Sequence, residues 1–214
     1  WEMHLETKSW ASGDKHGATN ENVKRHIDFA SKYGFRGVLV EGWNVGWDGN
    51  WFANGRGFSF TQPYPDFDMD MLLEYGAKSG VKIIGHHETG GNIAVYEDQL
   101  DAAMAYYAAH GVEAVKTGYV ADAGGLIDVG PDGKQRMVWH DSQRNAQHHL
   151  KVVQTAAAHK IAVNAHEPIK DTGLRRTYPN WVAREGARGM EYQAWGVPGN
   201  PASHVPTLYF TRML

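Results

Sequence analysis

The chain has 214 residues, a formal net charge of −3 with histidine counted as neutral, and no cysteine. This charge does not indicate a nucleic-acid or anionic-membrane surface, and the lack of cysteine excludes disulfides and thiolate metal sites. No stretch approaches the roughly 18 apolar residues of a membrane-spanning helix. Eight tryptophans, ten tyrosines and twelve histidines are many for this length. Aromatic rings stack on sugars, although they also fill protein cores.

Predicted helices and strands alternate along the chain. In order, we expect a helix over 20–34, a strand over 37–41 buried on both faces, a loop with a small hairpin over 42–62, a helix over 66–80, a strand over 81–86, a helix over 94–110, a strand over 114–120, an inserted hairpin within 121–138, a helix over 142–159 and a strand over 161–166. The Pro131-Asp132-Gly133 sequence is a strong turn signal and supports the inserted hairpin.

The predicted strands start about 33–47 residues apart, as expected of βα units with long loops. A doubly wound sheet is the alternative, but no G-x-G-x-x-G phosphate turn follows a predicted strand. We therefore expect an α/β fold of the (β/α)8 TIM-barrel type. A complete barrel needs about 250 residues, so about six βα units fit. We expect residues 1–214 to form one catalytic barrel domain that is truncated at both ends.

Two glutamates follow predicted strands directly. Glu88 ends the sequence His86-His87-Glu88, and Glu167 follows His166 in Asn164-Ala165-His166-Glu167. Barrel strands deliver catalytic groups at their carboxyl ends, although a single glutamate there could also be a solvated cap. Because strand residues alternate, His86 and Glu88 can share a pocket while His87 turns away. A zinc site from these histidines is a weaker alternative, since no H-E-x-x-H helix supports it.

Lys116 lies inside the apolar strand predicted over 114–120. A buried lysine is unfavourable unless its amine reaches a carboxylate or a substrate. We therefore favour a side chain that points into the barrel mouth over one that reaches the surface along the sheet.

Other candidate residues lie in predicted loops. Glu185 and Glu191 are either solvated loop charges or a calcium ligand and an acid, since Ca²⁺ prefers several carboxylate oxygens. Trp43, with Trp47 and Trp51, forms either a small core within its loop or a sugar-stacking wall. Carboxylates that meet at one barrel mouth suggest glycoside hydrolysis, calcium binding or both.

The sequence resembles glycoside hydrolase family 97, the calcium-dependent bacterial α-glucosidases and α-galactosidases. The segments that carry the resemblance span the chain; they are 1–4, 37–44, 61–68, 86–89, 115–119, 164–167, 176–180 and 185–191.

The resemblance implies a role for each candidate residue. Glu191 corresponds to the general acid, while Glu167 and Glu88 correspond to the pair that holds the attacking water in the inverting branch. The implied calcium ligands are Glu167, Glu185 and Glu191. The implied sugar contacts are His86, Lys116 and His166, and Trp43 is added as a candidate sugar contact from its place in the loop.

The resemblance also separates two reaction types. Retaining members carry an aspartate nucleophile at the end of the fourth strand, where this sequence has Gly118. We therefore expect calcium-dependent hydrolysis of terminal α-glucosidic bonds in oligosaccharides, with inversion. The alternatives are a retaining α-galactosidase and a non-catalytic barrel that binds sugar or calcium weakly. The family's N-terminal and C-terminal β-domains are absent from residues 1–214, and family members suggest a periplasmic location.

Overall fold

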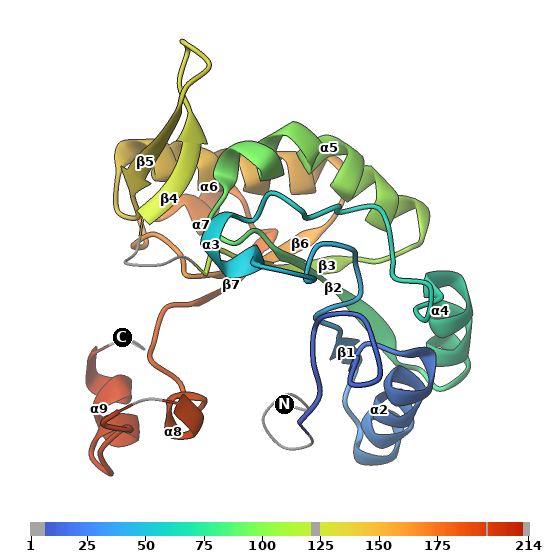
Figure 1. Cartoon of the computed structure of the whole chain (residues 1–214). Helices are drawn as coiled ribbons and strands as arrows, with labels where there is room; N and C mark the ends of the chain where they lie inside the picture. The colour runs from blue at the N-terminus through green and yellow to red at the C-terminus, as the bar shows by residue number, and fades with distance from the viewer. Residues whose placement is uncertain (1–6, 121–124, 196, 212–214) are drawn as a thin grey trace.

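A computed structural model describes residues 7–120, 125–195 and 197–211. Its main sheet has five strands in the order β1-β2-β3-β6-β7, and all neighbouring pairs are parallel. The strands are β1 (Gly37–Leu39), β2 (Lys82–Glu88), β3 (Ala114–Gly118), β6 (Ala162–His166) and β7 (Trp181–Glu185). Because every strand runs in the same direction, all five carboxyl ends lie along one edge of the sheet (Figure 1).

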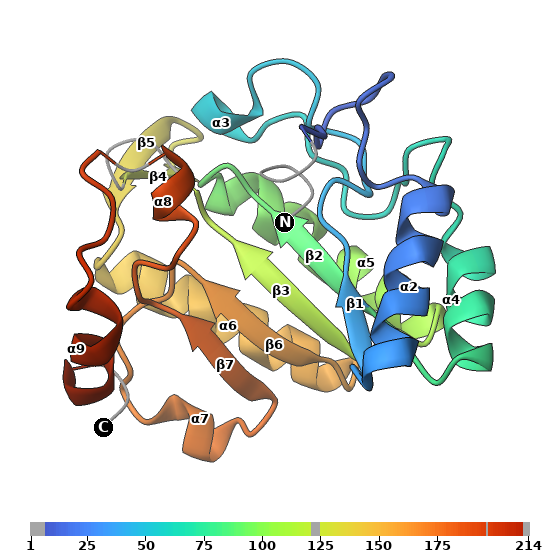
Figure 2. The same cartoon turned by 90° about the horizontal axis from the view of Figure 1, so that it is seen from below.

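The long helices α5 and α6 cover one face of the central strands. The described helices are α2 (Asn20–Tyr33), α3 (Trp51–Asn54), α4 (Met69–Lys78), α5 (Ile93–Ala109), α6 (Gln143–Ala158), α7 (Leu174–Thr177), α8 (Tyr192–Trp195) and α9 (His204–Thr211). In Figure 2, α5 and α6 lie behind β2, β3 and β6, whereas the near face of these strands has no helix in front of it. A doubly wound sheet has helices on both faces, so the arrangement is that of a barrel wall.

The helix boundaries follow local capping signals. The side chains of Thr19, Asp68, Asn92 and Ser142 each accept a hydrogen bond from a backbone N–H in the first turn of α2, α4, α5 and α6. Such caps satisfy amides that have no partner within the helix. The four long helices therefore begin within about three residues of the predicted starts.

A two-stranded antiparallel hairpin, β4 (Gly125–Val129) and β5 (Gln135–Trp139), stands apart from the main sheet. This confirms the predicted insertion, although residues 121–124 lie outside the described residues. Arg144 of α6 attaches the hairpin to the helices, because its guanidinium donates to Asp128 at 2.9 and 3.0 Å and to Glu97 at 2.8 Å.

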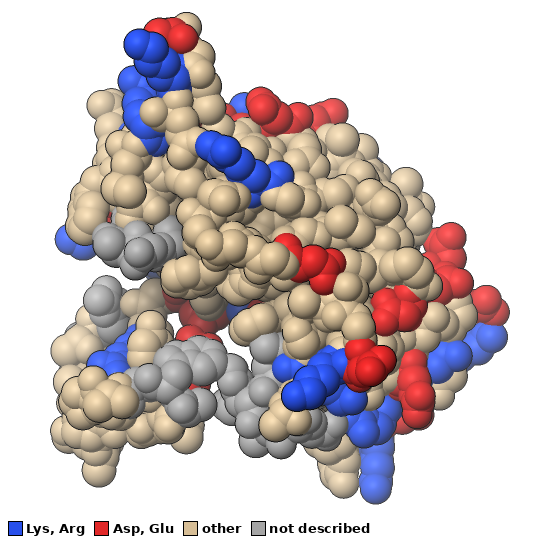
Figure 3. Space-filling model, viewed as in Figure 1, with Lys and Arg blue, Asp and Glu red and all other residues tan. Residues whose placement is uncertain are grey.

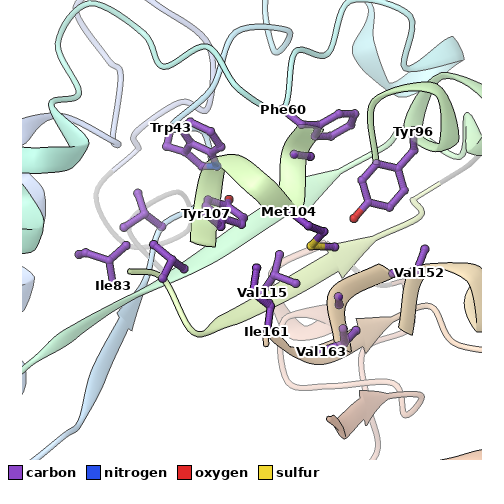
Figure 4. Packing of buried hydrophobic residues seen from close by; sticks show 14 of the residues in the cluster. Trp43, Phe60, Ile83, Tyr96, Met104, Tyr107, Val115, Val152, Ile161 and Val163 are labelled. Atoms are coloured by element: carbon purple, nitrogen blue, oxygen red, sulfur yellow. The ribbon is translucent and has the colours of Figure 1, made fainter. Parts of the chain in front are cut away.

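The hydrophobic core lies between the sheet and its helices. Val115 and Val163, from neighbouring strands, point toward Met104 of α5 and Val152 of α6 (Figure 4). Gly85 is required for this packing, since a Cβ there would lie 2.4 Å from the ring of Tyr107.

Three sequence-based expectations need correction. Residues 181–185, for which no strand was expected, form the edge strand β7. The strand starting at Gly37 is only half-buried rather than buried on both faces, because no further strand covers its outer edge in the described residues. The loop over 42–62 contains the short helix α3, and an antiparallel bridge between Asn44 and Pro63 closes it, in agreement with the small hairpin expected there. The described sheet also has five parallel strands, against the six or so units expected.

The surface in Figure 3 carries acidic and basic side chains interspersed, without a large area of one sign. Among the helices that the structure describes, none has the length and apolar composition needed to cross a bilayer.

Candidate active site at the carboxyl ends of the strands

The strand register brings most of the predicted site residues together. His86 pairs with Lys116 across β2 and β3, and Glu88 pairs with Gly118 on the same two strands. Across β6 and β7, His166 pairs with Glu185. These pairs line the carboxyl ends of four adjacent strands, which is where barrel enzymes place their chemistry.

Glu88 is buried, and backbone amides hold its carboxyl group. Its Oε1 accepts hydrogen bonds from the N–H groups of Thr89 at 3.0 Å, Gly90 at 2.8 Å and Val120 at 3.2 Å. Burial, with the negative charge of Glu167 as a second cause, raises the pKa of Glu88 to about 8. The carboxyl group is therefore largely protonated at neutral pH, in spite of the three amide donors.

Gly118 leaves room for the Glu88 side chain. A Cβ at position 118 would lie 2.2 Å from Glu88 Oε2, which is far closer than van der Waals contact. Position 118 therefore accepts no side chain while Glu88 keeps this conformation.

Glu167 lies just beyond β6 and has a left-handed backbone, with a φ of 43°. Such a φ is uncommon outside glycine and marks local strain, which often accompanies function. Its Oε2 accepts a hydrogen bond from the Tyr119 N–H at 2.8 Å, and its carbonyl oxygen accepts one from His140 Nε2 at 2.7 Å. The strained residue is thus fixed at both its side chain and its backbone.

His166 bridges two carboxylates. Its Nδ1 lies 2.5 Å from Glu167 Oε1, and its Nε2 lies 2.9 Å from Glu185 Oε1. Burial lowers the pKa of His166, but the hydrogen bonds to these two carboxylates outweigh it and raise the pKa to about 10. Since a carboxylate only accepts hydrogen bonds, both ring nitrogens donate and the imidazole is a cation.

A second charged group connects the first strand to this cluster. Lys116 Nζ lies 3.1 Å from Glu41 Oε1 and 3.5 Å from Glu185 Oε2, so the lysine side chain points into the mouth, as the sequence indicated. Burial raises the pKa of Glu41, but the charges of His86 and Lys116 reverse this and lower the pKa to about 2. Because burial lowers the pKa of His86 to about 4, Lys116 is the partner that stays charged at neutral pH.

Glu41 is a site residue that the sequence analysis missed. It follows β1 as Glu88 ends β2, so the same signal of a glutamate at a strand end could have identified it. Its carboxylate also accepts a hydrogen bond from Trp10 Nε1 at 3.3 Å and lies 3.5 Å from His86 Nε2.

A cavity of about 780 Å³ opens beside this cluster. Among the candidate residues, Lys116, Glu185 and Glu191 line it, together with Glu41. Glu191 therefore shares a cavity with Glu185, whereas Glu88 and Glu167 do not line it.

The predicted calcium ligands do not form a metal site as they are arranged. No three histidine, aspartate or glutamate side chains in the described residues converge to hold a metal ion, which also applies to the zinc alternative. The oxygens of Glu167 and Glu185 are instead directed at His166, and Glu185 also faces Lys116. A cation among these carboxylates would therefore compete with two protein cations.

Trp43 belongs to the core, so the prediction that it contacts a sugar is wrong. Its side chain is 1% exposed, its Nε1 donates to the carbonyl oxygen of His86 at 2.8 Å, and its ring stacks on Tyr106. Trp47 is buried too and stacks on His86. Both tryptophans support the site from behind, because no open ring face remains for a ligand.

His87 points away from the mouth, as strand alternation predicts. Its ring stacks on Tyr107 at a centroid distance of 4.7 Å, and its Nδ1 lies 3.0 Å from the Tyr96 hydroxyl. It is fully buried, so it contributes to the packing between the sheet and the helices.

Fold and site together define a barrel-wall domain whose mouth is lined by carboxylates and their cationic partners. Residues 1–187 match the family Glycoside hydrolase 97. The chain belongs to this family.

Solved structures and a curated relative agree with that membership. A Glycoside Hydrolase Family 97 enzyme from Pseudoalteromonas sp. strain K8, solved in complex with acarbose, is 58% identical, with a TM-score of 0.95 over 100% of this chain and 32% of its own. A variant of that enzyme in complex with panose matches equally well. A retaining alpha-galactosidase from Bacteroides thetaiotaomicron is 26% identical over 85% of this chain and 23% of its own length. A beta-arabinopyranosidase, 19% identical with a TM-score of 0.57, shares the fold.

The chain spans about a third of the Pseudoalteromonas enzyme and about a quarter of the alpha-galactosidase. The activity and substrate of the complete gene product are therefore a matter of proposal.

Proposed function

We propose that the complete gene product containing this chain hydrolyses terminal α-glucosidic bonds of oligosaccharides with inversion at the anomeric carbon. One observation carries the proposal: consecutive backbone amides, those of Tyr119 and Val120, hold Glu167 and Glu88 at one point of the mouth. Two carboxyl groups fixed together can hold and activate one water molecule, as an inverting glycosidase requires.

The two carboxyl groups divide the work of activating water. Glu88, protonated at neutral pH because it is buried, orients the water molecule by hydrogen bonding. Glu167, whose oxygens receive hydrogen bonds from His166 and the Tyr119 amide, is the carboxylate that accepts the proton as the water oxygen bonds to the anomeric carbon. Two carboxyl groups in different environments can thus take different roles.

Glu191 is the proposed general acid, which protonates the leaving glycosidic oxygen. Its place on the cavity that Glu185 and Lys116 also line supports a position on the substrate side of the mouth. In an inverting enzyme the acid and the base stand about 6.5–9.5 Å apart so that a water molecule and the sugar fit between them.

Three further residues are proposed to bind sugar hydroxyls at the cleavage subsite. Lys116 and His166 present cationic donors, and His86 presents a neutral imidazole. Their existing partners are carboxylates, so a bound sugar would share these donors with the protein.

The competing function is that of a retaining α-galactosidase. The relative from Bacteroides thetaiotaomicron is such an enzyme. A retaining enzyme needs a nucleophile about 5–5.5 Å from its acid. The collision of any side chain at Gly118 with Glu88 argues against an aspartate nucleophile there.

The experiment is to follow the anomeric proton of the first-formed product by NMR during hydrolysis of panose and of an α-galactoside. Panose is chosen because a relative at 58% identity was solved with it. Inversion releases the β-anomer from an α-glucoside, whereas release of the α-anomer, or turnover of the galactoside alone, would reject the proposal.

Calcium dependence and a periplasmic location stay predictions. The calcium prediction rests on the carboxylates Glu167, Glu185 and Glu191, of which the first two would have to turn from His166 to bind the ion. The location rests on family membership.

A further inference from the structure

Tyr119 connects the candidate base pair to the helix layer. Its own N–H holds Glu167 Oε2 at 2.8 Å, and the next amide, of Val120, holds Glu88 Oε1 at 3.2 Å. The conformation of these two peptide groups therefore sets where both carboxyl groups stand relative to each other.

The phenol ring of Tyr119 is itself anchored. Its side chain is 1% exposed, and its hydroxyl lies 2.9 Å from Nε2 of His148, which is fully buried on α6. The other ring nitrogen of His148, Nδ1, lies 2.7 Å from Glu97 Oε1 on α5. The chain of contacts thus runs from α5 through α6 to the end of β3.

The neighbouring groups determine which atom donates in each hydrogen bond between Glu97, His148 and Tyr119. Burial lowers the pKa of His148, so the imidazole is neutral. Because the Glu97 carboxylate only accepts, Nδ1 carries the proton and Nε2 accepts from the Tyr119 hydroxyl. Hydrogen bonds in such a buried chain strengthen one another.

Glu97 is held firmly at the outer end. Arg144 donates to its Oε1 at 2.8 Å and Lys151 to its Oε2 at 3.0 Å. The hydrogen bonds from His148, Arg144 and Lys151 outweigh burial and lower the pKa of Glu97, so it is ionised.

We propose that His148, anchored by Glu97, is a positioning residue that acts through the Tyr119 hydroxyl to fix the two amides holding the candidate carboxyl groups. This rests on the proposed function, since it assigns those carboxyl groups to water activation. The alternative is that the hydrogen bonds between Glu97, His148 and Tyr119 only stabilise the packing of α5 and α6 on the sheet.

Two variants of the complete gene product separate these possibilities. Tyr119→Phe removes only the hydroxyl and keeps the ring, and His148→Gln removes the imidazole that links this hydroxyl to Glu97. A positioning role predicts that kcat falls about tenfold while KM stays within about twofold, because displaced catalytic groups slow the chemical step. The kcat of the double variant should be no lower than that of the more impaired single variant, since both substitutions interrupt the same series of hydrogen bonds.

Tyr178→Phe is the matched control. Its hydroxyl also forms a hydrogen bond with α6, accepting from Gln154 at 2.7 Å, but among the described residues it contacts neither the two carboxyl groups nor their amides. It should keep kcat within about twofold. A purely packing role would lower the melting temperature of Tyr119→Phe and leave kcat per folded molecule unchanged.

The outcomes distinguish this inference from the proposed function. If Tyr119→Phe keeps wild-type kcat while Glu167→Gln is inactive, the positioning role is rejected and the function stands. If the wild type does not invert α-glucosides, the function fails, and a crystal structure of Tyr119→Phe decides the inference. Unchanged amide–carboxyl distances for Glu88 and Glu167 would overturn it, whereas lengthening of either would support it.

Discussion

Glu88 and Gly118 are directly opposite each other on neighbouring parallel strands, and the carboxyl group of Glu88 occupies the space that a side chain at position 118 would need. The two residues therefore depend on each other. Gly118 on β3 is therefore needed for the buried conformation of Glu88, to which we assign a role in water activation.

Gly118→Ala should remove most of the activity and lower the free energy of unfolding by about 1–3 kcal/mol, because the added methyl group overpacks a buried site. Activity on an α-glucoside and chemical denaturation would measure the two effects. Gly57→Ala is the control, since a Cβ there would meet its nearest neighbour at 3.7 Å. Near-normal activity of Gly118→Ala would show that Glu88 can move without loss.

Glu88→Gln should stabilise the fold at high pH. Burial raises the folded pKa of Glu88 from 4.5 to about 8, so the folded state binds more protons than the unfolded state between these values. The stability of the wild type then falls as pH rises through this window, and the glutamine variant lacks this loss. The two proteins should be similar near pH 4.5 and differ by on the order of a few kcal/mol near pH 9.

Urea denaturation of wild type and Glu88→Gln at several pH values would test this. A difference in stability that does not grow with pH would contradict a protonated, buried Glu88. Glu74→Gln, an exposed substitution on α4, controls for general effects of removing a negative charge.

Glu191→Gln should reduce kcat on panose by about 10²–10⁴-fold, the usual contribution of a general acid. An aryl α-glucoside with an acidic phenol needs little protonation as it leaves, so its hydrolysis should be spared. Steady-state kinetics on both substrates would measure the ratio. Equal losses on the two substrates would rule out the acid role.

Calcium should stabilise the isolated 214-residue chain little or not at all. A ligand that binds only the folded state raises the melting temperature, but Glu167 and Glu185 here bind His166 instead. Ca²⁺ also prefers six to eight oxygens. Thermal unfolding with calcium and with chelator, for this chain and for the complete gene product, would measure the effect. A large saturable shift of the short chain would contradict the prediction.

Local sequence patterns predicted much of the architecture. The alternation of apolar segments, and the short apolar runs before Glu88 and Glu167, placed the long helices and two candidate strand ends close to their positions in the structure. These features are read from neighbours within a few residues, and both helix capping and strand alternation act over that range.

Other features depended on contacts between distant segments. The sequence indicated that Lys116 needs a carboxylate but did not identify Glu41, which lies 75 residues away in the chain. The sequence allowed Trp43 to face either a ligand or the core. Its contacts with His86 and Tyr106 in the structure place it in the core.

The sequence by itself therefore determined that the strands before Glu88 and Glu167 end in carboxyl groups, because apolar runs, alternation and turn signals are local properties of the chain. Only the tertiary structure decided that two consecutive amides hold Glu88 and Glu167, that His166 is a cation between carboxylates, and that a glycine must face Glu88. Protonation states, and the space available to a side chain, depend on burial and on neighbours that the packing of the whole sheet brings together. No local sequence pattern encodes them.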